Sequence, residues 1–90
     1  MTPAPKKNGK KGRRYQVVIH NSDELEFAYV IESLQTVLGY ELTQATTCAY
    51  LIDHKGSYVV KAFGDKEHAE ATVETLVDYE FDAELIDTFA

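Results

Sequence analysis

Tryptophan is absent from this 90-residue sequence, and cysteine occurs only once. A single cysteine excludes an intrachain disulfide, and with it the small secreted scaffolds that disulfides hold together. No apolar run approaches the roughly 18 residues that a membrane span requires, and the N-terminus lacks the apolar core of a secretory signal. The sequence therefore predicts a soluble, cytoplasmic protein, and its length predicts one small domain.

Basic residues are scarce beyond residue 14. The first 14 residues hold six of the nine basic residues and no acidic one, so residues 15–90 carry three basic and fifteen acidic residues, a net charge of −12. The six are Lys6, Lys7, Lys10, Lys11, Arg13 and Arg14. An acidic body repels phosphate backbones and suits a basic protein surface or a cationic ligand group.

The first 14 residues also contain both prolines and two of the five glycines. This composition favours a flexible arm, since it offers too little apolar surface to fold. Three interpretations of the arm stay open: a solubilising tail, a contact arm for a partner protein, and a nucleic-acid-binding segment. The acidic body opposes the last of these.

Hydrophobic periodicity predicts strands over residues 15–20, 57–63 and 84–89, and helices over residues 24–38, 42–53 and 66–79. Gly39 and Gly56 stand where left-handed helix caps are expected, and Asp65 is expected to cap the third helix. The order β-α-α-β-α-β favours an α+β fold. We expect a single domain over residues 15–90, with a three-stranded antiparallel sheet and three helices on one face of it.

Each predicted helix has apolar residues three and four positions apart, which indicates one buried face per helix. The first helix is expected to bury Phe27, Val30, Ile31, Leu34, Val37 and Leu38, with Ser33 among the residues on its other side. The second is expected to bury Ala45, Cys48, Ala49 and Ile52. The third is expected to bury Ala69, Val73, Leu76 and Val77.

The sequence has none of the motifs that mark common catalytic sites, such as a nucleophile elbow, a phosphate loop or a Cys-x-x-Cys pair. His20, His54 and His68 lie on separate elements without metal-ligand spacing, so we expect solvated or capping roles and no metal or other cofactor. Cys48 falls on an apolar helix face, where a small buried hydrophobe is the expected role. A binding module is therefore favoured over an enzyme.

Several features, taken in chain order, carry a resemblance to a known family. Residues 15–23 read Tyr-Gln-Val-Val-Ile-His-Asn-Ser-Asp, and the helix that follows contains Val30, Ile31, Leu34 and Gln35. Later features are Ala45-Thr46, Gly56 before a strand that ends in Phe63, the run Glu67-His68-Ala69-Glu70, and Tyr79. This ordered set resembles the ClpS family of Clp protease adaptors over about residues 15–89, and an N-terminal extension fits the same pattern.

The resemblance implies a non-catalytic adaptor of the N-end rule pathway. Such a protein binds the N-terminal residue of a substrate, usually a large hydrophobic one, and delivers the substrate to a ClpA- or ClpC-type AAA+ unfoldase coupled to the ClpP peptidase. The resemblance also implies docking on the N-terminal domain of the unfoldase through the last helix, where Glu67 and Glu70 lie. A monomer that binds neither nucleic acid nor membrane is expected.

The resemblance also assigns a binding site to particular residues. The α-ammonium of the substrate needs hydrogen-bond acceptors, best if anionic, and the matching positions are Asn21, Ser22, Asp23 and Asp53. The apolar cavity for the first side chain would be lined by Leu25, Phe27, Val30, Ala49, Ile52 and Leu85.

Two positions depart from the family pattern at the proposed ammonium. The family loop reads Asn-Asp-Asp where this chain has Asn21-Ser22-Asp23, and a family His is replaced by Asp53. We hypothesise that the negative charge missing at Ser22 is regained at Asp53. Phe27 and Ala49 stand where the family commonly has Met, which predicts altered selectivity for the bound residue.

Other interpretations remain at this stage. Asn21 and Asp23 could simply cap the first helix, Asp53 could be a solvated helix end, the apolar residues could be ordinary core, and the two glutamates could be plain surface. At the level of function, the alternatives are a diverged regulator that docks on the unfoldase without binding N-termini, an interaction domain like that of the ribosomal stalk protein, and a nucleic-acid binder acting through the arm.

Overall fold

The structure, a computed structural model, describes residues 14–88. Its elements are, in chain order, β1 (Tyr15–His20), α2 (Phe27–Leu38), α3 (Leu42–Lys55), β2 (Ser57–Phe63), α4 (Lys66–Asp78) and β3 (Asp82–Asp87). The predicted order of strands and helices is confirmed. The expected arm lies outside the described residues except for Arg14, its last residue.

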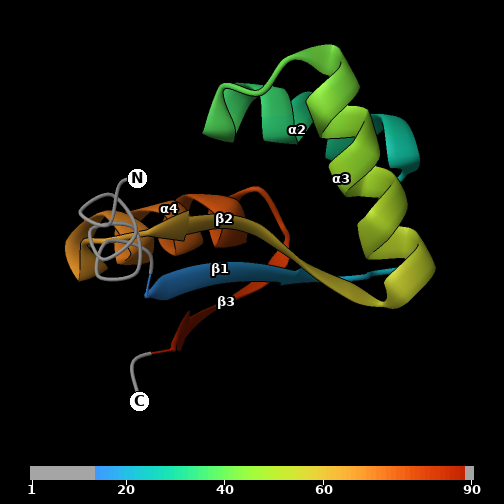
Figure 1. Cartoon of the computed structure of the whole chain (residues 1–90). Coiled ribbons are helices and arrows are strands. Elements are labelled where there is room, and N and C mark those ends of the chain that lie inside the picture. Colours follow the sequence, from blue (N-terminus) through green and yellow to red (C-terminus); the bar gives the residue numbers. More distant parts are fainter. Residues whose placement is uncertain (1–13, 89–90) are drawn as a thin grey trace, which may run out of the picture.

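The central strand of the sheet is β1, which pairs antiparallel with β2 on one side and with β3 on the other (Figure 1). Its sequence explains this position, because three consecutive apolar residues, Val17, Val18 and Ile19, are all buried. Buried apolar side chains on both faces are typical of a strand in the middle of a sheet, where side chains of the two neighbouring strands pack beside them.

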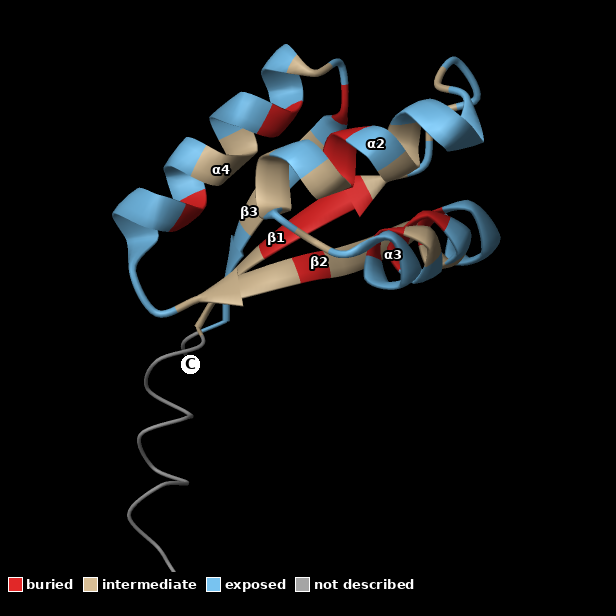
Figure 2. Ribbon diagram, turned by 90° about the horizontal axis from the view of Figure 1, so that it is seen from above, coloured by how far each residue is buried: buried red, intermediate tan, exposed pale blue. Residues whose placement is uncertain are grey.

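All three helices lie on one face of the sheet, as predicted (Figures 1 and 2). Helix α4 packs on all three strands, α3 packs on β2, and α2 rests on α3 and α4. Figure 2 marks the buried positions on β1, on β2 and on parts of all three helices. The core comprises Val17, Ile19, Leu34, Ala45, Cys48, Ile52, Val60, Ala69, Leu76 and Phe81.

Strand β2 contains an irregularity at Val60. Val18 pairs with Val59 and Val17 with Lys61, so Val60 is an extra residue in the register. Such a bulge leaves backbone groups of the extra residue without a partner on the neighbouring strand. The Tyr40 hydroxyl donates a hydrogen bond to the Val60 carbonyl at 2.6 Å, which satisfies it. Burial raises the pKa of Tyr40, because ionisation would place a charge in this poorly hydrated position.

The three predicted caps are confirmed. Gly39 and Gly56 end α2 and α3 in the left-handed conformation, with φ of 72° and 88°. Side chains at these angles are strained, which accounts for glycine at both positions. Asp65 caps α4 by accepting a hydrogen bond from the backbone N–H of His68 at 3.2 Å.

Several predicted boundaries are wrong, among them the end of α3, which is Lys55 rather than Asp53. Helix α2 begins at Phe27 rather than near Glu24, because residues 23–25 form a turn and Glu26 takes the N-cap position. Strand β3 begins at Asp82 rather than Glu84 and ends at Asp87. The chain turns tightly after α4 at Glu80, whose φ is 77°, so the next strand starts earlier than its apolar residues suggest.

Three predictions of burial on the helices are also wrong. Val77 is 51% exposed and Phe27 is 46% exposed, whereas Ser33 is only 2% exposed. Helix α2 is contacted by α3 and by α4, so its buried arc is wider than a single stripe and includes the small Ser33. The predicted buried stripe of the second helix is confirmed in full: Ala45, Cys48, Ala49 and Ile52.

Candidate functional site: an acid-rimmed cavity at the end of the central strand

The loop between β1 and α2 is tied to the end of α3. The backbone N–H of Asn21 donates to the Gly56 carbonyl at 2.8 Å. This bond continues the pairing of His20 with Ser57, which holds the end of β1 beside the start of β2. Because β2 follows α3 directly, the loop residues come to lie next to the last turn of α3, where Asp53 is located.

A cavity of about 250 Å³ opens between this loop, the start of α2 and the last turns of α3. Its lining consists of Asn21, Ser22, Asp23, Leu25, Phe27, Val30, Ala49, Ile52 and Asp53. These are nine of the ten residues to which the sequence analysis assigned the amine-binding and side-chain sites. They come from two stretches of the chain, residues 21–30 and 49–53, which are separated by eighteen residues.

Leu85, the tenth, is not among the residues that line this cavity. It lies on β3 opposite Val17 and packs against the core. Its position in the sheet is one of the inward-facing ones, which alternate along β3 with the exposed Glu84 and Ile86. The structure therefore does not bring Leu85 together with the other nine residues, and places it in the sheet against the core.

The polar side of the cavity carries three side chains whose hydrogen-bonding capacity is unused within residues 14–88. Asn21, Asp23 and Asp53 are exposed. In that part of the chain, none of their side chains takes part in a protein hydrogen bond or ion pair. Together they supply one amide and two carboxylate groups at the mouth of the cavity. Such a set accepts hydrogen bonds from a cation.

Ser22 differs from its neighbours because it stabilises the loop itself. Its hydroxyl accepts a hydrogen bond from the backbone N–H of Glu24 at 3.3 Å, and its carbonyl accepts one from the backbone N–H of Leu25 at 3.4 Å. The N-cap of α2 is Glu26, without a side-chain capping bond. Asn21 and Asp23 therefore do not cap this helix, and capping does not account for these residue types.

The apolar residues that line the cavity differ in how far they are exposed to solvent. Ala49 and Ile52 of α3 are 2% and 4% exposed and join the wall to the core. Leu25 and Val30 are half-buried, and Phe27 at the first turn of α2 is 46% exposed. Ligand pockets for whole small molecules occupy about 300–1,000 Å³. The smaller volume of this cavity suits one apolar side chain.

The three histidines have separate surroundings. The ring of His20 lies 3.0 Å from Glu84, and the Nδ1 of His68 lies 2.7 Å from Asp65. His54 stacks on Tyr50, with ring centroids 4.6 Å apart. This contact was not among the predictions, although two rings four residues apart on a helix lie on one face and can meet. Within residues 14–88, no group of three or more His, Cys, Asp or Glu residues is arranged to hold a metal ion.

Cys48 lies in the core, and burial raises the pKa of its thiol. A thiol in an apolar setting stays protonated and is a poor nucleophile. The role expected from the sequence, a small buried hydrophobe, is consistent with this position.

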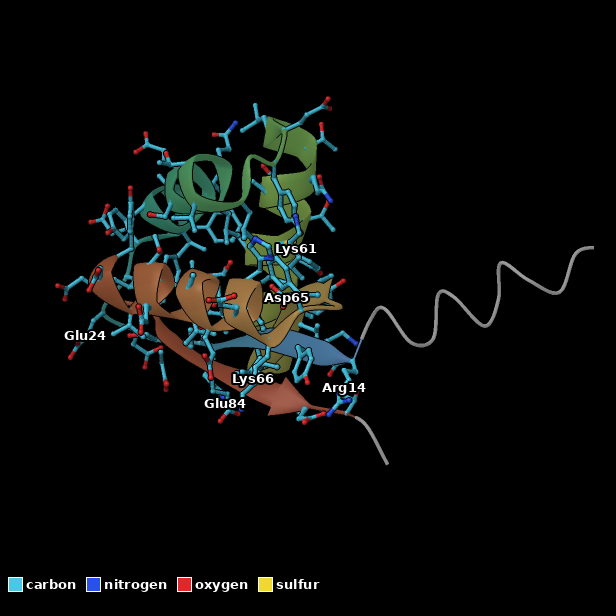
Figure 3. All side chains as sticks on the ribbon, turned by 90° about the vertical axis from the view of Figure 1, so that its left-hand side faces the viewer. Arg14, Glu24, Lys61, Asp65, Lys66 and Glu84 are labelled. Atoms are coloured by element: carbon cyan, nitrogen blue, oxygen red, sulfur yellow. The ribbon has the colours of Figure 1, made fainter. Side chains whose placement is uncertain are left out.

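A larger hollow, about 460 Å³, lies on the helix-free face of the sheet. It is lined by Val18, His20, Ser57, Tyr58, Val59, Glu84 and Ile86. Its two facing polar side chains, His20 and Glu84, already contact each other. Figure 3 shows Glu84 on β3, away from the helices. None of the residues assigned to amine or side-chain binding lines this hollow.

The two glutamates assigned to docking lie on α4, far along the chain from the cavity. Glu67 and Glu70 are both exposed, and Glu70 lies 4.0 Å from Lys66 of the same helix. Lys66 is labelled in Figure 3 near the start of α4.

No helix within residues 14–88 is long and apolar enough to cross a membrane.

Fold and site together define a small α+β domain with a one-sided sheet and an acid-rimmed apolar cavity beside its central strand. Comparison with known families gives a match over residues 10–84 to the family described as ATP-dependent Clp protease adaptor protein ClpS. The chain is also 34% identical over 70 residues to the ATP-dependent Clp protease adapter protein ClpS of Edwardsiella ictaluri (strain 93-146). That alignment covers 78% of this chain and 65% of the relative, just under two thirds of its length. The chain belongs to the ClpS family.

Proposed function

We propose that this protein is an adaptor that binds the N-terminal residue of substrate proteins and delivers them to a ClpA- or ClpC-type AAA+ unfoldase for degradation by ClpP. The observation that carries the proposal is the cavity itself. Two distant segments bring unpartnered acceptors, among them Asn21 and Asp53, to the mouth of an apolar cavity sized for one side chain. An N-terminal residue with a large hydrophobic side chain offers the complement, a cation attached directly to an apolar group.

Magnitudes support this assignment. Burying a Leu or Phe side chain stabilises a complex by roughly 1.5–3 kcal/mol, and each charge-assisted hydrogen bond to the ammonium adds roughly 1.5–3 kcal/mol. After the costs of association, two such bonds and one buried side chain correspond to a dissociation constant of micromolar order.

The two departures from the family pattern, Ser22 in the loop and Asp53 on α3, are consistent with a relocated charge. Ser22 has no carboxylate, and its hydroxyl is used by the backbone of Glu24. Asp53 lines the same cavity and has no partner in the described part of the chain. We propose that Asp53 attracts the ammonium in place of the charge that Ser22 lacks.

The proposal is tested with labelled peptides that differ only in the first residue: Leu, Phe, Tyr, Trp, Arg and acetylated Phe. Fluorescence anisotropy is expected to give micromolar binding to one or more of the large hydrophobic residues and no binding after acetylation, which removes the positive charge. Failure of every free N-terminus to bind would contradict the adaptor pocket and favour a regulator that docks on the unfoldase without binding N-termini.

The role of Asp53 is tested by charge reversal. Asp53→Lys is expected to weaken peptide binding by tenfold or more, because it removes a charge-assisted hydrogen bond worth roughly 1.5–3 kcal/mol. About 1.4 kcal/mol corresponds to each factor of ten in affinity. Glu74→Lys is the matched control, because it changes the net charge equally at an exposed position on α4 that does not line the cavity. Equal affinities of the two variants would show that Asp53 does not hold the ammonium.

Delivery requires a second surface, for which we propose the exposed side of α4 with Glu67 and Glu70. A double substitution, Glu67→Ala with Glu70→Ala, is expected to reduce binding to the N-terminal domain of the unfoldase without affecting peptide affinity. Loss of peptide affinity in this variant would indicate misfolding rather than lost docking, and unchanged unfoldase binding would exclude these glutamates.

A further inference from the structure

A pair of stacked rings lies on α3 next to residues that line the cavity. The rings of Tyr50 and His54 lie 4.6 Å apart with an interplanar angle of 20°. The Tyr50 hydroxyl lies 3.4 Å from Nε2 of His54. Tyr50 is nevertheless 51% exposed. One large ring is thus held in place by a second ring while much of its surface meets solvent.

The helical positions place this pair at the cavity mouth. Ala49 and Asp53 line the cavity, and Tyr50 follows the first of these by one residue and precedes the second by three. Residues three apart on a helix are surface neighbours. The Tyr50 ring therefore borders the carboxylate that we propose to hold the ammonium of the bound residue.

We propose that the Tyr50–His54 pair is a second subsite, which receives the side chain of residue two of a bound N-terminus and favours arginine there. The inference rests on the proposed function, because a first residue whose ammonium lies at Asp53 places the Cα of residue two about 3.8 Å from its own Cα, within side-chain reach of the ring beside Asp53. The guanidinium of arginine is planar and stacks on aromatic faces, whereas the lysine ammonium is a compact, strongly hydrated point charge. The neighbouring Asp53 attracts either cation, so only the ring distinguishes them.

Two features make the ring a suitable surface for stacking. A side chain already ordered by a neighbour loses less freedom when a ligand binds, and His54 orders Tyr50 in this way. A cation over an exposed aromatic ring gains enough to tighten binding about two- to fivefold. We therefore expect a moderate preference for arginine over lysine at position two, superimposed on the electrostatic preference for either cation over leucine.

The experiment uses three peptides that begin Phe-Arg, Phe-Lys and Phe-Leu and are otherwise identical, with the acetylated form of each. Affinities are measured for the full-length protein and for Tyr50→Ala. The unmodified protein is expected to bind Phe-Arg more tightly than Phe-Lys, by up to about fivefold, because the lysine ammonium gains less from the ring. In Tyr50→Ala this difference should disappear, while the preference for Phe-Lys over Phe-Leu should remain because Asp53 is intact.

Leu42→Ala is the control, since Leu42 is 61% exposed on the same helix and does not line the cavity. It should retain the preference for arginine, and His54→Ala should reduce it by freeing the Tyr50 ring. Equal binding of Phe-Arg and Phe-Lys to the unmodified protein, or a difference that survives in Tyr50→Ala, would overturn the second subsite and leave the proposed function standing. Failure of all three free peptides to bind would overturn both.

Discussion

The two halves of α2 carry similar apolar residues in contrasting surroundings. Leu34, in the second half, is fully buried under the neighbouring helices, whereas Phe27, in the first turn, is 46% exposed at the cavity. The difference is not one of hydrophobicity, because both side chains would gain from burial. It lies in what surrounds them: the second half packs against protein, and the first half borders a space that protein does not fill. The first half of α2 therefore borders an open cavity, where an apolar side chain stays partly exposed.

Polar groups at the bulge in β2 and at the cavity also differ in whether they have a hydrogen-bond partner. The carbonyl of Val60, left over at the bulge in β2, is satisfied by the Tyr40 hydroxyl. The side chains of Asn21 and Asp53 at the cavity have no such partner within residues 14–88. Satisfied polar groups stabilise the fold, whereas exposed acceptors left unpaired are free to bind a ligand.

The largest effect is expected on the free energy of unfolding, and it should differ between the two halves of α2. Leu34→Ala should lower the free energy of unfolding by about 2–5 kcal/mol, because it leaves a cavity in a packed interior. Phe27→Ala should lower it by about 1 kcal/mol or less, since the side chain is only partly packed. Urea denaturation followed by circular dichroism measures both. Similar losses in the two variants would mean that Phe27 belongs to the core rather than to a binding surface.

The next effect should appear in binding and not in stability. Asn21→Ala removes a side-chain acceptor but keeps the backbone N–H that bonds to Gly56, so the loop should stay in place. Peptide affinity is expected to fall by about tenfold or more, with an unfolding free energy close to that of the unmodified protein. Gln44→Ala, at an exposed position on α3 away from the cavity, is the control. A purely structural role for Asn21 would instead lower stability and leave affinity unchanged.

A third variant tests the hydrogen bond from the Tyr40 hydroxyl to the Val60 carbonyl. Tyr40→Phe keeps the ring but removes the donor to Val60, so the free energy of unfolding should fall by about 1–3 kcal/mol. Tyr58→Phe removes a hydroxyl without a hydrogen-bond partner in the described residues and should change stability by about 0.5 kcal/mol or less. Chemical denaturation of the two variants side by side gives the comparison, and equal losses would exclude a special role for the bulge.

The smallest effect is expected at alkaline pH. Burial raises the pKa of Cys48 and of Tyr40 in the folded protein above their ordinary values of 9.0 and 10.0. The folded state therefore holds these protons after the unfolded chain has begun to lose them. Stability from this source is complete below pH 9 and declines as the pH rises above it. Urea denaturation at pH 7.5, 9 and 10 should show a shallower decline in Cys48→Ala, and identical declines would contradict the assignment.

Much of this fold could be predicted from the sequence, because its local signals agree with one another. Tyr15–His20 and Ser57–Phe63 were predicted with the observed bounds, and the glycine caps fixed the ends of α2 and α3. Errors arose where tertiary contacts decide the outcome. Ser33 is buried because two helices meet α2, a circumstance that no single-helix pattern contains.

The site was predictable in membership but not in its details. Nine of the ten assigned residues line one cavity. Their assignment came from the family resemblance, which aligned both segments of the chain with the family pattern. The register of β3 places Leu85 in the sheet, where it packs against the core. The turn that engages Ser22 depends on local geometry that composition and periodicity do not report. The stacking of His54 on Tyr50 follows from their spacing of four residues on a helix, a signal that the sequence does contain.

The contacts of Arg14 bear on how the domain would respond to a pulling force on its N-terminal side. The Arg14 carbonyl accepts hydrogen bonds from the backbone and the hydroxyl of Thr88, and its guanidinium pairs with Asp87, so the chain is pinned where it enters β1. Figure 3 shows Arg14 at the opposite end of the sheet from Glu24 in the cavity loop. A pull applied ahead of Arg14 would act along a central strand whose hydrogen bonds run across the direction of force. These bonds would share the load and break together rather than one at a time, so the domain should resist being drawn out by its own N-terminus.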